Sequence, residues 1–239
     1  MGEYADRFVA AYNKIERHLE RLVDKDSRGG YHMGFPELVR KARDSSAVVR
    51  FHELDLREFG ELRNAIVHGS VEPGVVIAEP HLSAVELIER IASGLVQPEK
   101  VIPRFAREVI YVSPDEPLSR ILALVNKHHY TQFPVLDTRS GLLGLITYTG
   151  IVNWLATNYT GSSLVALDVT AKELLRFEDP LENFRVVDQD SNVYQVKEIF
   201  AANIDRTRQK VNAVLVTEDG TGRARLLGIV TPSDIVSIV

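Results

Sequence analysis

The stretch LDLREFGELRNAIVHGS carries three residues whose types and spacing could act on a phosphodiester: Arg63, Asn64 and His68. A histidine can take the proton from a ribose 2′-hydroxyl, and an arginine can stabilise the charge on the phosphate that this oxygen attacks. Asn64, one turn before His68, can orient the imidazole or the phosphate. Proton transfer and charge stabilisation at a ribose phosphate are therefore chemistry that these residue types could perform.

The same residues also have structural interpretations. In a helix Arg63 falls inside an apolar arc, where its stem can pack and its head can pair with Glu58 or Glu61. His68 precedes a glycine and can cap the last carbonyls of the helix. One helix also turns Arg63 and His68 about 140° apart, so a cleft would need two chains facing each other across a two-fold axis. Structural or interface use, RNA cleavage and RNA binding without cleavage therefore stay open.

The stretch GIVTPSD near the C-terminus carries a second candidate site, made by Thr231, Ser233 and Asp234. A carboxylate just past a strand can accept hydrogen bonds from two ribose hydroxyls. The two hydroxyl residues stand at a predicted helix start, which favours phosphate. The alternative is that Thr231 and Asp234 cap the last helix.

Two regions with different periodicity must position these residues. In the first hundred residues, apolar side chains recur every three or four positions over 4–23, 36–50, 54–68 and 83–96, which predicts a four-helix bundle. Ser83 and Glu86 fit a capping box for the last of these helices.

From about residue 101 the chain alternates short β-type runs with helical stretches. The β-type runs are EVIYVS, FPVLD, LLGLIT, FRVVD, NAVLVT and LLGIVT. LLGLITYTGIV near 142–152 returns as LLGIVTPSDIV near 226–236, so the region contains two copies of one unit. Each unit reads strand, helix, strand, strand, helix, and Thr170 with Glu173 fits a capping box in the joint between them.

This repeat closely resembles a CBS domain, and the pair resembles a Bateman module. The resemblance rests on SPDEPLSRILALVNKHHYTQFPVLD and on the closing motifs GLITYTG and GIVTPSD. The second closing motif fits the family pattern, whereas the first has Gly150 where an aspartate is expected. The resemblance implies two βαββα units in pseudo-two-fold tandem, an α+β or α/β class after the all-α bundle.

The resemblance also implies a ligand, an adenosine nucleotide such as AMP, ADP or ATP that acts as a regulator. By the family pattern the ribose and phosphate contacts come from Thr231, Ser233 and Asp234, with Thr147 in the mirror site of the first copy. The adenine pocket would be lined by Ile110, Tyr130 and Thr131, and Arg206, Arg208 and Lys210 could reach phosphates. CBS pairs commonly dimerise through their helices, so a homodimer joined through both regions is expected.

The first hundred residues resemble the HEPN superfamily of helical bundles. That family is marked by an arginine, four to six residues and then a histidine, often with a polar residue after the arginine. Arg63, Asn64 and His68 fit this mark. The members that use these residues are metal-independent ribonucleases with a two-fold cleft, which implies single-stranded RNA as a candidate partner.

Composition excludes several classes of protein. The chain has 28 Lys+Arg against 33 Asp+Glu, a net charge of −5, which argues against non-specific nucleic-acid binding, and no DNA partner is expected. It contains no cysteine, and its histidines lack metal-ligand spacing, so no metal is expected. It has no apolar run of about 18 residues and no signal-peptide pattern at its acidic N-terminus. We expect a cytoplasmic protein with no membrane partner.

Together these patterns predict a regulatory protein with a HEPN-like bundle at 1–100 and CBS motifs at 101–160 and 161–239. In this interpretation the CBS pair is not catalytic, binds an adenosine nucleotide and modulates the bundle. One alternative is a HEPN-type ribonuclease under nucleotide control. Another is a pure dimerisation or interaction module.

Overall fold

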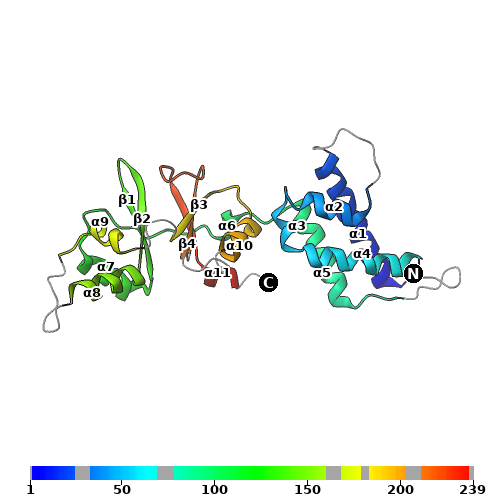
Figure 1. Cartoon of the computed structure of the whole chain (residues 1–239), viewed down its shortest axis with the longest axis horizontal. Helices are drawn as coiled ribbons and strands as arrows, with labels where there is room; N and C mark the ends of the chain where they lie inside the picture. Colours follow the sequence, from blue (N-terminus) through cyan, green and yellow to red (C-terminus); the bar gives the residue numbers. More distant parts are fainter. Residues whose placement is uncertain are drawn as a thin grey trace. The chain divides into compact units, whose positions relative to one another are not determined.

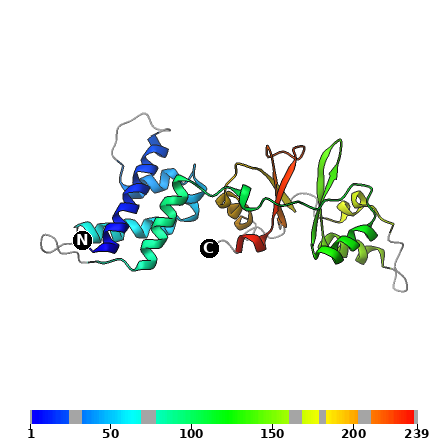
Figure 2. The same cartoon turned by 180° about the vertical axis from the view of Figure 1, so that it is seen from behind.

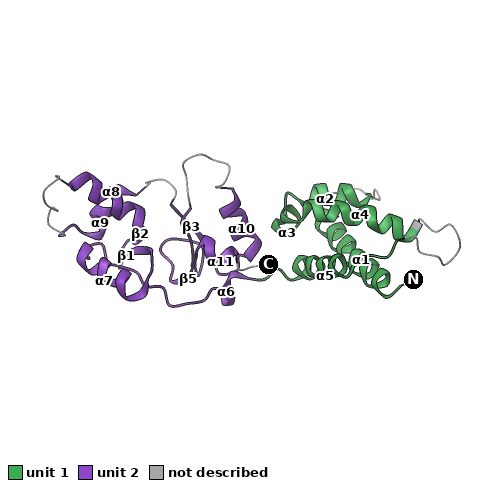
Figure 3. Ribbon diagram, turned by 90° about the horizontal axis from the view of Figure 1, so that it is seen from below, with its two compact units in different colours: residues 1–99 green, residues 100–239 purple. Residues whose placement is uncertain are grey.

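The computed structural model describes residues 2–24, 33–68, 78–159, 168–178, 183–202 and 211–236. The chain divides into two compact units, Met1–Glu99 and Lys100–Val239, coloured separately in Figure 3.

Every regular element among the described residues of the first unit is a helix. Its helices are α1 (Glu3–Asp24), α2 (Phe35–Ala42), α3 (Ala47–Phe51), α4 (Glu53–His68) and α5 (Leu82–Val96), and α1 runs alongside α5 in both Figure 1 and Figure 2. The apolar faces of these helices meet in one core, in which Phe8 and Phe59 pack edge to face with ring centroids 5.4 Å apart. The amphipathic periodicity read from the sequence therefore gives a bundle, as predicted.

The predicted second helix is two helices. A turn separates α2 from α3, and Ser46 begins α3 by accepting a hydrogen bond from the amide of Val49. Ser45 bonds back to the carbonyl of Ala42. Serine side chains compete with the backbone in this way at helix ends, so the Ser45–Ser46 pair breaks the helix that the apolar pattern suggested.

The predicted capping box of the fourth bundle helix is wrong. Helix α5 begins after His81, whose Nδ1 accepts a hydrogen bond from the amide of Ser83. The cap is thus a histidine two residues before the expected serine. The predicted box of Thr170 and Glu173 is confirmed, with both reciprocal hydrogen bonds present.

The second unit contains two small sheets with helices packed on them. Strands β1 (Gln132–Asp137) and β2 (Gly141–Thr147) form an antiparallel pair, accompanied by α7 (Leu118–His128), α8 (Tyr148–Asn158), α9 (Ala171–Leu174) and a 3₁₀ turn, η1 (Leu175–Phe177). Strands β3 (Phe184–Asp188), β4 (Ala213–Thr217) and β5 (Leu226–Val230) form the other sheet, with β3 parallel to β4 and β5 antiparallel to it. The short helix α6 (Val101–Arg104) precedes the first repeat, while α10 (Val193–Ala201) and α11 (Pro232–Val236) belong to the second.

The two repeats differ in their first strand. The predicted strand EVIYVS makes a single parallel bridge, between Val112 and Val135, whereas the corresponding β3 pairs with β4 over its whole length. Pro134, which precedes the bridge residue, has no N–H to donate to a neighbouring strand. The bridge therefore does not extend, although the predicted fold class, a helical bundle followed by two α/β repeats, is confirmed.

Each repeat is crossed by a chain segment that leads into the other repeat. Ala106, ahead of the first repeat, bridges to Gly228 in β5, and a Cβ at Gly228 would lie 2.5 Å from the carbonyl oxygen of Phe105. In the first repeat, a Cβ at Gly144 would lie 2.7 Å from a methyl of Leu175, in the linker between the repeats. The glycine of each closing motif thus makes room for a crossing segment.

No helix within the described ranges is long and apolar enough to cross a membrane.

Candidate functional site

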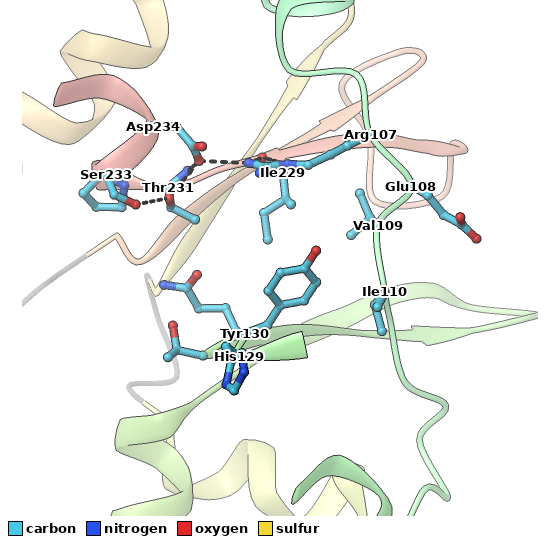
Figure 4. A pocket seen from close by; sticks show the side chains of 13 residues that line it. Arg107, Glu108, Val109, Ile110, His129, Tyr130, Ile229, Thr231, Ser233 and Asp234 are labelled. Carbon is cyan, nitrogen blue, oxygen red and sulfur yellow. Dashed lines mark hydrogen bonds and ion pairs between the residues drawn. The ribbon is translucent and has the colours of Figure 1, made fainter. Parts of the chain in front are cut away.

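A cavity of about 490 Å³ lies between the two repeats of the second unit. It is lined by residues 107–110 from the leading segment, 129–132 from the first repeat, and 229 and 231–234 from the second repeat. Figure 4 shows Tyr130 projecting its ring into the cavity toward Ile229 and Arg107, whereas Glu108 points away from it. Its lining combines apolar side chains such as Ile110 and Ile229 with a few polar groups, a combination that is typical of small-molecule sites.

The cavity gathers most of the predicted nucleotide-binding residues. Those that line it are Ile110, Tyr130, Thr131, Thr231, Ser233 and Asp234. Thr147 lies instead at the closing motif of the first repeat, where it caps α8. The predicted phosphate ligands Arg208 and Lys210, together with Arg206, lie outside the described residues.

Asp234 is held by a dense set of hydrogen bonds from its own motif. The amide and the hydroxyl of Thr231 each donate to Asp234 Oδ2 over 2.7 Å, and the Thr231 hydroxyl lies 2.9 Å from that of Ser233. The capping interpretation of this motif is therefore present in the structure. It does not exclude ligand binding, because the Asp234 side chain keeps 24% of its surface exposed and lines the cavity.

Arg107 is the charged partner of Asp234, and no pattern in the sequence marked it. Its guanidinium donates to Asp234 Oδ2 over 2.8 Å and to the carbonyl of Ile229, although Arg107 and Asp234 are 127 residues apart. The leading segment brings it there, because the amide of Arg107 donates to the carbonyl of Leu227 in β5. The Arg107 side chain is 41% exposed, so this guanidinium can also meet a ligand in the cavity.

Opposing influences act on the ionisation of Asp234. Partial burial is the largest of them and works against the charged form. The hydrogen bonds from Thr231 and the ion pair with Arg107 together outweigh it and lower the pKa of the carboxyl below its ordinary value. Asp234 is therefore a carboxylate at neutral pH, as an acceptor for ribose hydroxyls must be.

The equivalent place in the first repeat holds a different carboxylate. Glu178, which follows η1 in the linker, accepts hydrogen bonds from the amide of Thr147 over 2.6 Å and from its hydroxyl over 2.9 Å. Asn183 Nδ2 donates to the same carboxylate over 3.1 Å and to the carbonyl of Leu145 over 2.8 Å. Burial is the main influence on Glu178 and raises the pKa of its carboxyl, against these hydrogen bonds.

Arg63, Asn64 and His68, the other candidate site, lie toward the end of α4 in the bundle. The Arg63 guanidinium lies 5.6 Å from the centre of the Tyr12 ring, and its Nη1 donates to Asn64 Oδ1 over 3.3 Å. Tyr12 is buried at 3% exposure, and this burial raises the pKa of its hydroxyl. His68 ends α4, and its side chain lies outside the described residues. The contact with Tyr12 accounts for an arginine inside the apolar arc.

Comparison with known proteins finds a protein family whose model matches the second unit. A family model described as "CBS domain" matches residues 104–157 and 170–239. The CBS-domain containing protein ATU1752 from Agrobacterium tumefaciens is 24% identical, with a TM-score of 0.39 over 54% of this chain and 88% of that one. The CBS domain pair of protein MJ0100, in complex with 5′-methylthioadenosine and S-adenosyl-L-methionine, is 21% identical, with a TM-score of 0.44 over 58% of this chain and 94% of that one.

A third structure, CBSX2 in complex with AMP, is 18% identical, with a TM-score of 0.41 over 58% of this chain and 93% of that one. No curated protein sequence is significantly similar to the chain. The family match lies within the second unit, so the HEPN-like nature of the bundle stays a prediction.

Proposed function

The chain belongs to the CBS-domain family, and we propose that the cavity beside Asp234 binds an adenosine nucleotide as a regulatory ligand. One observation carries the proposal: the cavity brings together a carboxylate, a guanidinium and an exposed aromatic ring from three separate chain segments. A nucleotide offers a matching group to each, namely ribose hydroxyls, phosphates and a planar base. The cavity volume of about 490 Å³ falls within the range of small-molecule pockets.

Each group of the ligand has a proposed contact. The ribose hydroxyls donate to Asp234, and the Thr231 and Ser233 hydroxyls lie next to that carboxylate. The α-phosphate pairs with Arg107, because a charge-assisted contact between guanidinium and phosphate is among the stronger polar interactions. The base lies against Tyr130 and Ile110, which line the first-repeat side of the cavity.

Calorimetry with AMP, ADP and ATP tests this proposal on the whole chain. Asp234→Ala removes the acceptor for the ribose, and hydrogen bonds to a charged group contribute about 1.5–3 kcal/mol, so affinity should fall by about 10- to 140-fold. Asp115→Ala, which removes an exposed carboxylate from the first repeat, is the matched control and should bind as the wild type does. Absence of binding by the wild type to all three nucleotides would refute the proposal.

We further propose that the nucleotide acts on the bundle by favouring one arrangement of a homodimer. A ligand changes an equilibrium only if it prefers one of the two states, so the proposal requires a dimer whose arrangement or stability depends on the nucleotide. Sedimentation of the protein at micromolar concentration, with and without AMP or ATP, tests it. A 26.8 kDa monomer under both conditions would contradict it.

For Arg63 we propose a structural role in the bundle, supported by its contact with the buried Tyr12 ring. The competing proposal is cleavage of single-stranded RNA by Arg63, Asn64 and His68 from two chains. Labelled RNA incubated with the protein in EDTA separates the two. A 2′,3′-cyclic phosphate product that disappears in His68→Ala would establish the ribonuclease, whereas intact RNA supports the structural role.

A further inference from the structure

The closing motifs of the two repeats can be compared position by position. Gly144 and Thr147 stand in the first as Gly228 and Thr231 stand in the second, and Gly150 corresponds to Asp234. In the second motif the amide and hydroxyl of the threonine donate to Asp234. In the first motif the same two groups donate to Glu178, which follows Gly150 by 28 positions in the sequence. The linker thus supplies the carboxylate that the first motif lacks.

The glycine at position 150 makes this substitution sterically feasible. A Cβ built there would lie 1.8 Å from Glu178 Oε1 and 2.4 Å from the carboxyl carbon. These distances are far below van der Waals contact, so Glu178 occupies the space where an aspartate side chain would begin. An aspartate at this position and the Glu178 carboxylate therefore exclude each other.

Glu178 is buried and therefore differs from a carboxylate that is accessible to a ligand. The residue is 9% exposed, and Asn183, itself 6% exposed, donates a further hydrogen bond to it. A buried carboxylate is tolerated when hydrogen bonds satisfy it, and here the donors come from the motif and from the linker. Asp234, by contrast, is partly exposed and lines a cavity.

We infer that Glu178 is a built-in occupant of the first closing motif, which it closes to a second nucleotide by taking the place and the donors of the missing aspartate. The chain then binds one nucleotide, beside Asp234, although it carries two copies of the motif. This inference rests on the proposed nucleotide binding, which it deepens by naming the residue that sets the stoichiometry.

The first arm of the test needs no nucleotide. Gly150→Asp in the otherwise unchanged chain should lower the urea midpoint of the second unit sharply, because the new side chain collides with Glu178. In a Glu178→Ala background the same substitution should cost little or raise the midpoint, because the introduced carboxylate can then accept the hydrogen bonds of Thr147. Asp168→Ala, which removes an exposed carboxylate from the same linker, is the matched control background and should not relieve the cost.

The second arm counts nucleotides by calorimetry with whichever of AMP, ADP and ATP the wild type binds. The expected stoichiometry is one per wild-type chain and two per chain in Gly150→Asp/Glu178→Ala. Equal costs of Gly150→Asp in the two backgrounds, two nucleotides on the wild type, or a single one on the double variant would each overturn the inference. A wild type that binds none of the three refutes nucleotide binding instead, and the first arm still decides whether Glu178 occupies the aspartate position.

Discussion

The two closing motifs of the second unit obtain a carboxylate in opposite ways. The second motif carries its own, Asp234, and meets a cation, Arg107, from the leading segment. The first motif lacks one, and the linker supplies Glu178, which accepts hydrogen bonds from Thr147 and Asn183. One acceptor faces a cavity and the other is buried.

A repeated motif therefore does not imply a repeated site. Both threonines need an acceptor for an amide and a hydroxyl at the start of a helix, and that local requirement is met in both repeats. Whether the acceptor stays accessible depends on which chain segment crosses the motif.

The largest effect is expected from the glycines that admit the crossing segments. Gly228→Ala would place a methyl 2.5 Å from a backbone carbonyl, whereas Gly144→Ala would meet a methyl of the Leu175 side chain. A backbone cannot move aside as a leucine can, so Gly228→Ala should destabilise the second unit by about 3 kcal/mol and Gly144→Ala by about 1 kcal/mol. Urea unfolding of the two variants measures both, and equal costs would contradict this difference between the repeats.

A smaller effect is expected from the cation of the open site. Arg107→Ala removes the proposed phosphate contact, worth about 2 kcal/mol for a hydrogen bond involving a charged group, so AMP affinity should fall by roughly 30-fold. Arg139→Ala removes an exposed arginine from the turn between β1 and β2 and serves as control. Unchanged affinity in Arg107→Ala would mean that this arginine serves only to hold Asp234.

The arginine of the bundle offers a contrast to Arg107. Arg63→Ala removes the contact with the Tyr12 ring and the packing of the stem, which together contribute about 1 kcal/mol. The loss should appear as a lower free energy of unfolding of the first unit. Nucleotide affinity should be unchanged, and a fall comparable to that of Arg107→Ala would show that the bundle takes part in binding.

The pH dependence of stability should have opposite signs at the two carboxylates. Asp234 has a lowered pKa in the folded state. Its contribution to the free energy of unfolding is therefore present above the pKa of the unfolded state and is lost as the pH falls through the pKa of the folded state. Glu178 has a raised pKa in the folded state. Its contribution to the free energy of unfolding is therefore present below the pKa of the unfolded state and is lost as the pH rises through the pKa of the folded state.

Substitutions can separate these two slopes. Glu178→Gln should therefore weaken the decline of stability as the pH rises from 4.5, the ordinary value for a glutamate, toward neutrality. Asp234→Asn should weaken the decline as the pH falls below 3.8, the ordinary value for an aspartate. Urea unfolding across this pH range measures the slope of the free energy of unfolding against pH in both variants. A change of that slope in the same direction in Glu178→Gln and Asp234→Asn would contradict the assignment.

The sequence grouped the residues of one motif that lie together at the cavity. Thr231, Ser233 and Asp234 are neighbours in the chain, and a duplicated pattern marked them. It did not predict Arg107 or Glu178, because each reaches its motif through a crossing segment, 127 and 31 residues away. No local pattern encodes such a contact.

The sequence patterns also predicted most of the fold and missed effects of single residues. Apolar periodicity predicted most of the helices, and five of the six predicted β-type runs form strands. The break between α2 and α3 depends on two serines, and the missing strand around Val112 depends on Pro134 in its neighbour. These are effects of single residues that a periodic pattern does not carry.

Of the two similar closing motifs, we propose that the one with Asp234 takes a nucleotide and the one with Glu178 does not. The most direct measurement is the calorimetric stoichiometry of AMP or ATP on the wild type and on Asp234→Ala. We predict one nucleotide per wild-type chain and no site of comparable affinity in the variant. Two nucleotides on the wild type, with one retained after Asp234→Ala, would contradict the account.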